Sequence, residues 1–211
     1  MFLPGVLQAV MVMLFWLTEL LGRLGWWPPL PLVLASTPVH VFLMLFGLFP
    51  FFIFGFLFTV YPRWLRDTAI GRRAYVPVFA LLFGGILLFT TGLFLDRRIV
   101  ALALMLFLAG WAGALVSLFR VYAHARERGP HERLLNLALA AGLLGIAVFL
   151  AAVLTGSAPL FVLARVLGLW LFLVPTVFLV SHRMIPFFSQ SGLINYIMVR
   201  PAWGPSVMVV C

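Results

Sequence analysis

The sequence predicts an all-α fold, a polytopic membrane bundle of about six transmembrane helices. Apolar residues make up 65% of the 211 residues and charged residues only 9%, unlike the balance of a water-soluble domain. Six apolar runs reach the ~20 residues that a helix needs to cross a bilayer. They lack the period-two alternation of barrel strands. We therefore expect helices, which satisfy their own backbone groups in lipid.

The six predicted spans follow one another closely along the chain. Connections such as Asp96–Arg98 and Gly156–Ala158 are too short for the next helix to lie far from the previous one. Consecutive helices should therefore be antiparallel neighbours in one transmembrane domain that covers residues 1–211. The predicted runs are Val6–Gly22, Val39–Tyr61, Val76–Leu95, Ile99–Phe119, Leu134–Thr155 and Pro159–Ser181.

The first run is predicted to stay in the protein as a helix. It is long, lacks a basic leader, and is followed by Trp26, Trp27 and several prolines rather than by a small-residue cleavage site. The two tryptophans stand where an aromatic belt meets the membrane surface.

Arginine placement predicts the orientation. The net charge is +9, and all 14 basic residues are arginines, ten of which follow the second, fourth and sixth runs. By the positive-inside rule, the N-terminus and the segment after the sixth run should be cytoplasmic. This placement explains the positive charge by topology and headgroup contact, so we expect a lipid bilayer and no nucleic acid as the partner. The ten are Arg63, Arg66, Arg72, Arg73, Arg120, Arg126, Arg128, Arg133, Arg183 and Arg200.

Two other charged sites fall within the apolar runs or at their ends. Glu19 and Arg23 are four residues apart, which places them on one helical face as an ion pair. Arg165 lies near the outer end of the sixth run, where its long side chain can reach the headgroups.

The last residues of the chain allow two interpretations. Asn195–Arg200 and the apolar Val207–Cys211 follow the sixth run, but Val207–Cys211 is too short to span a membrane. Either a seventh helix begins there, or the segment is an amphipathic anchor. Cys211 is the sole cysteine, so no internal disulfide is possible.

Histidines are the candidate metal ligands, because neutral imidazole offers a lone pair without a fixed charge. His124 and His131 fall in an arginine-rich loop and are expected to be solvated. His40 opens the second run and His182 follows the sixth, at predicted opposite ends of the membrane, ~20 to 30 Å apart. One metal ion therefore cannot bind both, and each is also explained as an interfacial residue.

Three segments resemble motifs of the NnrS family. His40–Gly47 (HVFLMLFG) and Gly55–Trp64 (GFLFTVYPRW) resemble its second-helix signature. His182–Ser189 (HRMIPFFS) resembles its Arg-x-Ile-Pro-Phe-Phe-Thr element. One departure is that Phe42 and Leu43 replace a histidine and a glutamate that family members often carry.

The resemblance implies a haem-containing and copper-containing protein of the bacterial inner membrane. That family is linked to nitric oxide metabolism in denitrifying bacteria and to resistance against nitrosative stress. Full-length members have more helices, so this chain would be the amino-terminal half or a shortened member. The implied metal ligands are His40 and His182. Met44 either supplies a soft sulfur ligand or fills the core. Arg183 could pair with a haem propionate, although a topology-setting arginine explains it equally well.

Three functional hypotheses follow from the sequence. The leading one is a membrane protein that binds haem, with or without copper, and acts in the nitric oxide response. The second is a cofactor-free transporter or channel that uses charged residues and helices broken at prolines. The third is a structural subunit that binds other membrane proteins. The residues invoked for transport are Glu19, Arg165, Pro50, Pro175 and Pro186.

Overall fold

The computed structural model describes residues 2–67, 69–126 and 128–192, and these fold into a helical bundle. Six helical spans are long and apolar enough to cross a membrane, which confirms the predicted fold class. The predicted runs lie inside these spans, except that the third was expected to continue to Leu95. The spans are Phe2–Arg23, Ser36–Trp64, Arg72–Gly92, Arg97–His124, Pro130–Thr155 and Ala158–Gln190.

Four spans are uninterrupted α-helices, and the second and sixth are each divided by a π-helical segment. The uninterrupted helices are α1 (Phe2–Arg23), α4 (Arg72–Gly92), α5 (Arg97–His124) and α6 (Pro130–Thr155). The second span comprises α2 (Ser36–Phe42), η1 (Leu43–Leu48) and α3 (Phe49–Trp64). The sixth comprises α7 (Ala158–Val166), η2 (Leu167–Leu173) and α8 (Val174–Gly192).

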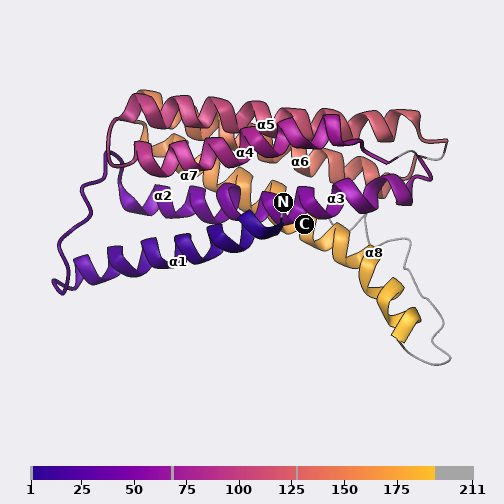
Figure 1. Ribbon diagram of the computed structural model, residues 1–211, viewed down its shortest axis with the longest axis horizontal. Helices are drawn as coiled ribbons and strands as arrows, with labels where there is room; N and C mark the ends of the chain where they lie inside the picture. Colours follow the sequence, from indigo (N-terminus) through magenta and orange to yellow (C-terminus); the bar gives the residue numbers. More distant parts are fainter. Residues whose placement is uncertain (1, 68, 127, 193–211) are drawn as a thin grey trace.

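The helices run along one long axis, and two of them diverge from it. Figure 1 shows the second span, α4, α5, α6 and α7 side by side, while α1 and the far part of α8 lean away from the bundle. Consecutive helices α4 and α5 pack together, as do α6 and α7, which confirms the expectation from the short connections. The bundle therefore has a packed centre and two splayed outer helices.

Small residues bring α4 and α5 close together. A Cβ added at Gly85 would lie 3.1 Å from the backbone nitrogen of Phe107, and one at Gly110 would lie 3.0 Å from that of Leu82. Such close backbone approach is typical of packing between membrane helices. At the connection, the Asp96 side chain accepts a 2.6 Å hydrogen bond from the backbone N–H of Arg98 and caps α5.

Each π segment precedes a proline. Pro50 follows η1, and Pro175 follows η2. Proline lacks an N–H donor, and its ring clashes with the carbonyl of the preceding turn. The wider π turn accommodates this defect without ending the span. The sequence also predicted a break at Pro186, but α8 continues through this residue.

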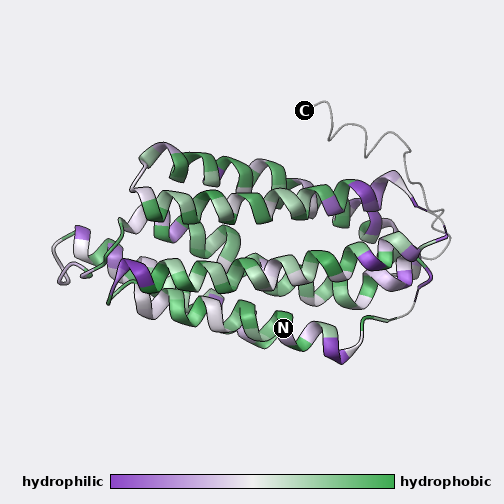
Figure 2. Cartoon of the chain, turned by 90° about the horizontal axis from the view of Figure 1, so that it is seen from above, coloured by the Kyte–Doolittle hydropathy of each residue, from purple (hydrophilic) through white to green (hydrophobic). Residues whose placement is uncertain are grey.

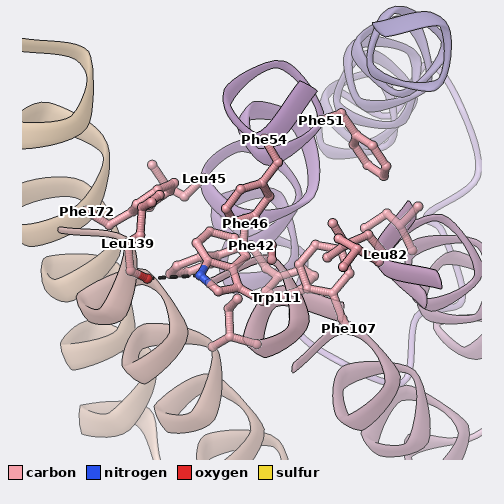
Figure 3. Packing of buried hydrophobic residues seen from close by; sticks show 14 of the residues in the cluster. Phe42, Leu45, Phe46, Phe51, Phe54, Leu82, Phe107, Trp111, Leu139 and Phe172 are labelled. Carbon is pink, nitrogen blue, oxygen red and sulfur yellow. Dashed lines mark hydrogen bonds between the residues drawn. The ribbon is translucent and has the colours of Figure 1, made fainter. Parts of the chain in front are cut away.

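The two π segments meet in an aromatic core. Phe46 of η1 and Phe172 of η2 stack with ring centroids 6.3 Å apart. A Cβ at Gly168 would lie only 2.5 Å from Phe46 Cζ, so a larger residue there would force the Phe46 ring to move. Trp111 Nε1 donates a 2.9 Å hydrogen bond to the Leu139 carbonyl, and Figure 3 shows this bond amid the surrounding rings. Aromatic side chains therefore fill the place where the interrupted spans cross.

The outside of the bundle is apolar along most of its length. Figure 2 shows hydrophobic residues covering the middle of the helices and hydrophilic residues gathered toward the ends. Leu3, Val10 and Leu14 of α1 are more than half exposed. Such surface is unfavourable in water and favourable against acyl chains, which supports a lipid bilayer as the environment. The expected seventh helix or anchor, including Asn195–Arg200 and Val207–Cys211, lies outside the described residues.

Candidate functional site

At the start of the second span, His40 packs against α1. Its ring stacks on Trp16 with centroids 4.0 Å apart and planes inclined by 19°. The guanidinium carbon of Arg23 lies 5.2 Å from the Trp16 ring centroid, within the range of a cation–π contact. His40 Nδ1 is buried, and no described residue supplies a hydrogen-bond partner for it. Met44, half-buried, follows one turn later at the beginning of η1.

The predicted ion pair of Glu19 and Arg23 is present. Arg23 Nε donates to Glu19 Oε1 at 3.1 Å, and Arg23 Nη2 donates to Ser36 Oγ at 2.9 Å. The Arg23 side chain is 47% exposed. This pair and its bond to Ser36 tie the end of α1 to the start of α2.

At the other end of the second span, three helices contribute a cluster of polar and aromatic side chains. We call it the α3–α6–α8 cluster. Its best-connected member is Arg183, whose Nη1 donates to Glu132 Oε1 and whose guanidinium carbon lies 4.6 Å from the Trp64 ring centroid. Glu132 is only 5% exposed, so its carboxylate needs this charged partner. The members are Tyr61, Trp64, His131, Glu132, Asn136, His182 and Arg183.

Two histidines adjoin within this cluster. The ring centroids of His131 and His182 are 5.7 Å apart. His131 Nε2 lies 2.6 Å from the Leu179 carbonyl oxygen, and since a carbonyl only accepts, this nitrogen carries a proton. His182 Nε2 is buried and lacks a hydrogen-bond partner in the described chain. The cluster therefore contains one anchored imidazole and one with an unused ring nitrogen.

The expectation that His131 is a solvated loop residue is wrong. His131 lies in the first turn of α6 and is half-buried against α8. The helix begins at Pro130, because proline fits the first helical position, where no N–H partner is needed. His124, in contrast, is exposed, and its Nδ1 lies 2.7 Å from the Arg120 carbonyl of its own helix.

A buried hydrogen bond completes the cluster. Asn136 Nδ2 donates to the Tyr61 hydroxyl at 2.7 Å, and neither residue is more than 8% exposed. Asn136 lies one helical turn after Glu132, so both face α3 and α8 from the same side of α6. Asn136 Oδ1 lacks a partner among the residues described. Sequence reasoning missed this bond, although the spacing of Glu132 and Asn136 is a signal that could have suggested a polar face.

The structure brings some predicted site residues together and separates others. His182 and Arg183 belong to one cluster, whereas His40 and Met44 lie near the opposite end of the second span. Arg165 is exposed on α7, whereas Glu19 lies on α1 and pairs with Arg23. Within the described ranges, no group of three or more His, Cys, Asp and Glu residues could hold a metal ion by itself.

Comparison with family models identifies the relationship of this chain. The model of the NnrS family, described as NnrS protein, matches residues 1–211. The chain belongs to the NnrS family. The match includes His40–Gly47 and Gly55–Trp64 of the second span and the His182–Ser189 segment, which are the residues on which the resemblance was based. Comparisons with curated proteins and with solved structures gave no match.

Proposed function

We propose that this NnrS-family protein binds haem in the membrane and acts in the nitric oxide response, with His182 as a haem ligand. Family membership suggests the nitric oxide response. The observation that carries the haem proposal is the unpartnered, buried Nε2 of His182 beside the Arg183 guanidinium. A buried polar atom without a partner costs free energy, so such an atom is a reasonable place to look for a ligand.

The donor atoms fit haem better than an isolated metal ion. A porphyrin already supplies four nitrogen ligands, so the protein needs to contribute only one or two axial ligands such as imidazole. His182 satisfies this requirement alone. Arg183 has several N–H donors, and Glu132 engages Nη1, which leaves others for a second carboxylate such as a propionate.

The surrounding residues would position His182. The Glu132–Arg183 ion pair and the bond from His131 to the Leu179 carbonyl both fasten α8 to α6. These contacts fix the position of His182 along the α6 axis. The Phe178 ring stacks with the His182 ring at a centroid distance of 6.0 Å. A haem held here would supply iron, a metal that binds nitric oxide. The chain itself would orient the His182 ring.

His40 and Met44 form the second candidate site for the same cofactor class. His40 also has an unpartnered buried nitrogen, Nδ1, and Met44 offers a soft sulfur ligand. A copper site built only from this chain would need further donors, because copper sites in proteins commonly use three strong ligands. We therefore assign haem to His182 first and retain His40 as the alternative ligand.

Visible spectroscopy tests the proposal. The full chain would be expressed with added haem precursor, purified in detergent, and examined for a Soret band and bound iron and copper. We expect a Soret band that is lost or shifted in His182→Ala and recovered when imidazole is added. The control is His124→Ala, which removes an exposed histidine whose Nδ1 contacts the Arg120 carbonyl of its own helix.

Each result has a distinct meaning for the proposal. If His40→Ala, and not His182→Ala, alters the band, the ligand assignment is wrong while haem binding stands. If wild-type protein is colourless and contains no iron after haem-replete expression, the haem proposal is rejected. The transporter hypothesis gains no support from the structure, because aromatic side chains fill the crossing of the two interrupted spans.

A further inference from the structure

An apolar groove runs between α5 and α6 at the arginine-rich end of the bundle. Its volume is about 470 Å³. On both helices, the side chains that line the groove become less polar from the end of the bundle toward its middle. From the end of the bundle toward its middle, α6 presents Arg133, Leu137 and Ala140, and α5 presents Tyr122, Phe119 and Leu115. The groove therefore has a polar mouth and a long apolar floor.

Arg133 gives the mouth its charge. It is exposed in the first turn of α6, and it takes part in no salt bridge with the residues that the structure describes. The acidic residue next to it, Glu132, points away into the α3–α6–α8 cluster and pairs with Arg183. Arg120 and Arg128 are also exposed at this end. The mouth therefore attracts an anion, and the attraction is not cancelled by its immediate neighbour.

We propose that this groove is a binding site for one anionic phospholipid. Arg133 would contact the phosphate, Tyr122 would lie at the level of the glycerol backbone, and an acyl chain would follow Leu137 and Ala140 along α6. Basic pockets between transmembrane helices are suited to anionic headgroups. The graded walls match a molecule that is charged at one end and apolar along its length, and they match neither a free anion nor a purely apolar solute.

The site is connected to the α3–α6–α8 cluster. Asn136 forms part of the groove wall, and its Nδ2 bonds the buried Tyr61 hydroxyl on α3. A bound acyl chain would therefore cover one side of the hydrogen bond that joins α6 to α3. The proposal needs no haem, so it can succeed or fail independently of the cofactor assignment.

Native mass spectrometry and thermal unfolding test the proposal on the delipidated full chain. Phosphatidylglycerol and phosphatidylcholine with identical acyl chains would be titrated into the detergent micelles. We expect phosphatidylglycerol to bind preferentially and to raise Tm. Arg133→Gln should weaken its binding about fivefold, as expected for one arginine at an anionic lipid surface. Arg73→Gln, which removes an exposed arginine from the first turn of α4, should change binding less than ~2-fold.

A second pair of variants tests the apolar floor. Ala140→Leu adds volume inside the groove and should also weaken binding of phosphatidylglycerol. Ala147→Leu adds the same volume two turns away on the same face of α6, outside the groove residues, and should have little effect. Both positions are only partly buried, so the fold should accept either change.

Four results would overturn the proposal. The first is equal binding of the two lipids, and the second is an equal response of Arg133→Gln and Arg73→Gln. The third is binding of phosphatidylglycerol to Ala140→Leu with the same affinity as to the wild-type protein. The fourth is a wild-type dimer that becomes monomeric in Ala140→Leu, because this would show that a second copy, rather than a lipid, occupies the groove.

Discussion

The two ends of the second span hold their histidines in different ways. At the α2 end, His40 rests on Trp16, and the nearby ion pair involves a half-exposed arginine. At the α3 end, His182 lies beside an ion pair whose carboxylate side chain is only 6% exposed and whose members come from two different helices. The first arrangement tolerates change because solvent or headgroups can replace its contacts. The second depends on each partner being present.

The largest expected effect comes from removing the carboxylate of the buried pair. Glu132→Ala leaves the Arg183 guanidinium without its partner and should destabilise the protein by about 3 kcal/mol. The matched change at the other end, Glu19→Ala, should cost less than ~1 kcal/mol, because that pair is more exposed. Unfolding in mixed micelles, followed by tryptophan fluorescence, would measure both. Equal losses would contradict the contrast between the two ends.

Between the ends, the aromatic crossing should be sensitive to added volume. Gly168→Ala places a Cβ against the Phe46 ring and should destabilise the protein by about 2 kcal/mol through overpacking. A Cβ at Gly84 meets nothing within 4 Å, so Gly84→Ala should be neutral or slightly stabilising. The melting temperatures of Gly168→Ala and Gly84→Ala, each compared with that of the wild-type protein, would test both expectations. Partial recovery in a Gly168→Ala, Phe46→Leu double variant would confirm that the clash is with the ring.

A smaller effect is expected for the hydrogen bond within the cluster. Tyr61→Phe removes the acceptor of Asn136 Nδ2, and Asn136→Leu removes the donor. A double-mutant cycle of unfolding free energies should give a coupling of about 1 kcal/mol, within the range found for side-chain hydrogen bonds between membrane helices. A coupling near zero would mean that this bond does not distinguish the cluster from the His40 end.

The smallest effect is expected at the His40 end itself. Trp16→Leu removes the stacking partner of His40 and the ring beneath Arg23 but keeps an apolar side chain. We expect a loss of about 0.5 kcal/mol in the same unfolding assay, typical of a single exposed aromatic or cation–π contact. A loss of unfolding free energy as large as that of Glu132→Ala would show that the contacts at the His40 end stabilise the protein as much as those of the α3–α6–α8 cluster.

The spans could be predicted from the sequence because hydropathy is a local property. Each run of apolar residues is long enough to identify its own helix, and the ion pair of Glu19 with Arg23 follows from a spacing of four. The charge pattern also separated the arginine-rich side of the bundle from the other. These inferences need no knowledge of which helices touch.

The α3–α6–α8 cluster could not be predicted in this way. Its ion pair joins Glu132 to Arg183, and its buried hydrogen bond joins Asn136 to Tyr61, all from helices far apart in the sequence. His131 was placed in a loop because its neighbours are charged, yet Pro130 begins the helix one residue earlier. Which helices meet depends on packing of the whole bundle, and periodicity within one helix carries no information about that.

The π segments have a consequence for how this chain can vary. A π turn contains one residue more than the α-helical turn it replaces, and each α-helical residue turns the chain by ~100°. Because a π turn and an α turn each complete one rotation, deleting the extra residue from η2 would restore an α turn and leave the residues beyond it near their present angular positions. Deleting a residue from α8 ahead of His182 would instead rotate His182 and Arg183 by about a quarter of a circle, away from α6, although every side chain in the motif had been retained. The segment Leu167–Leu173 is therefore a place where the chain can lose one residue without changing where the later motif is presented.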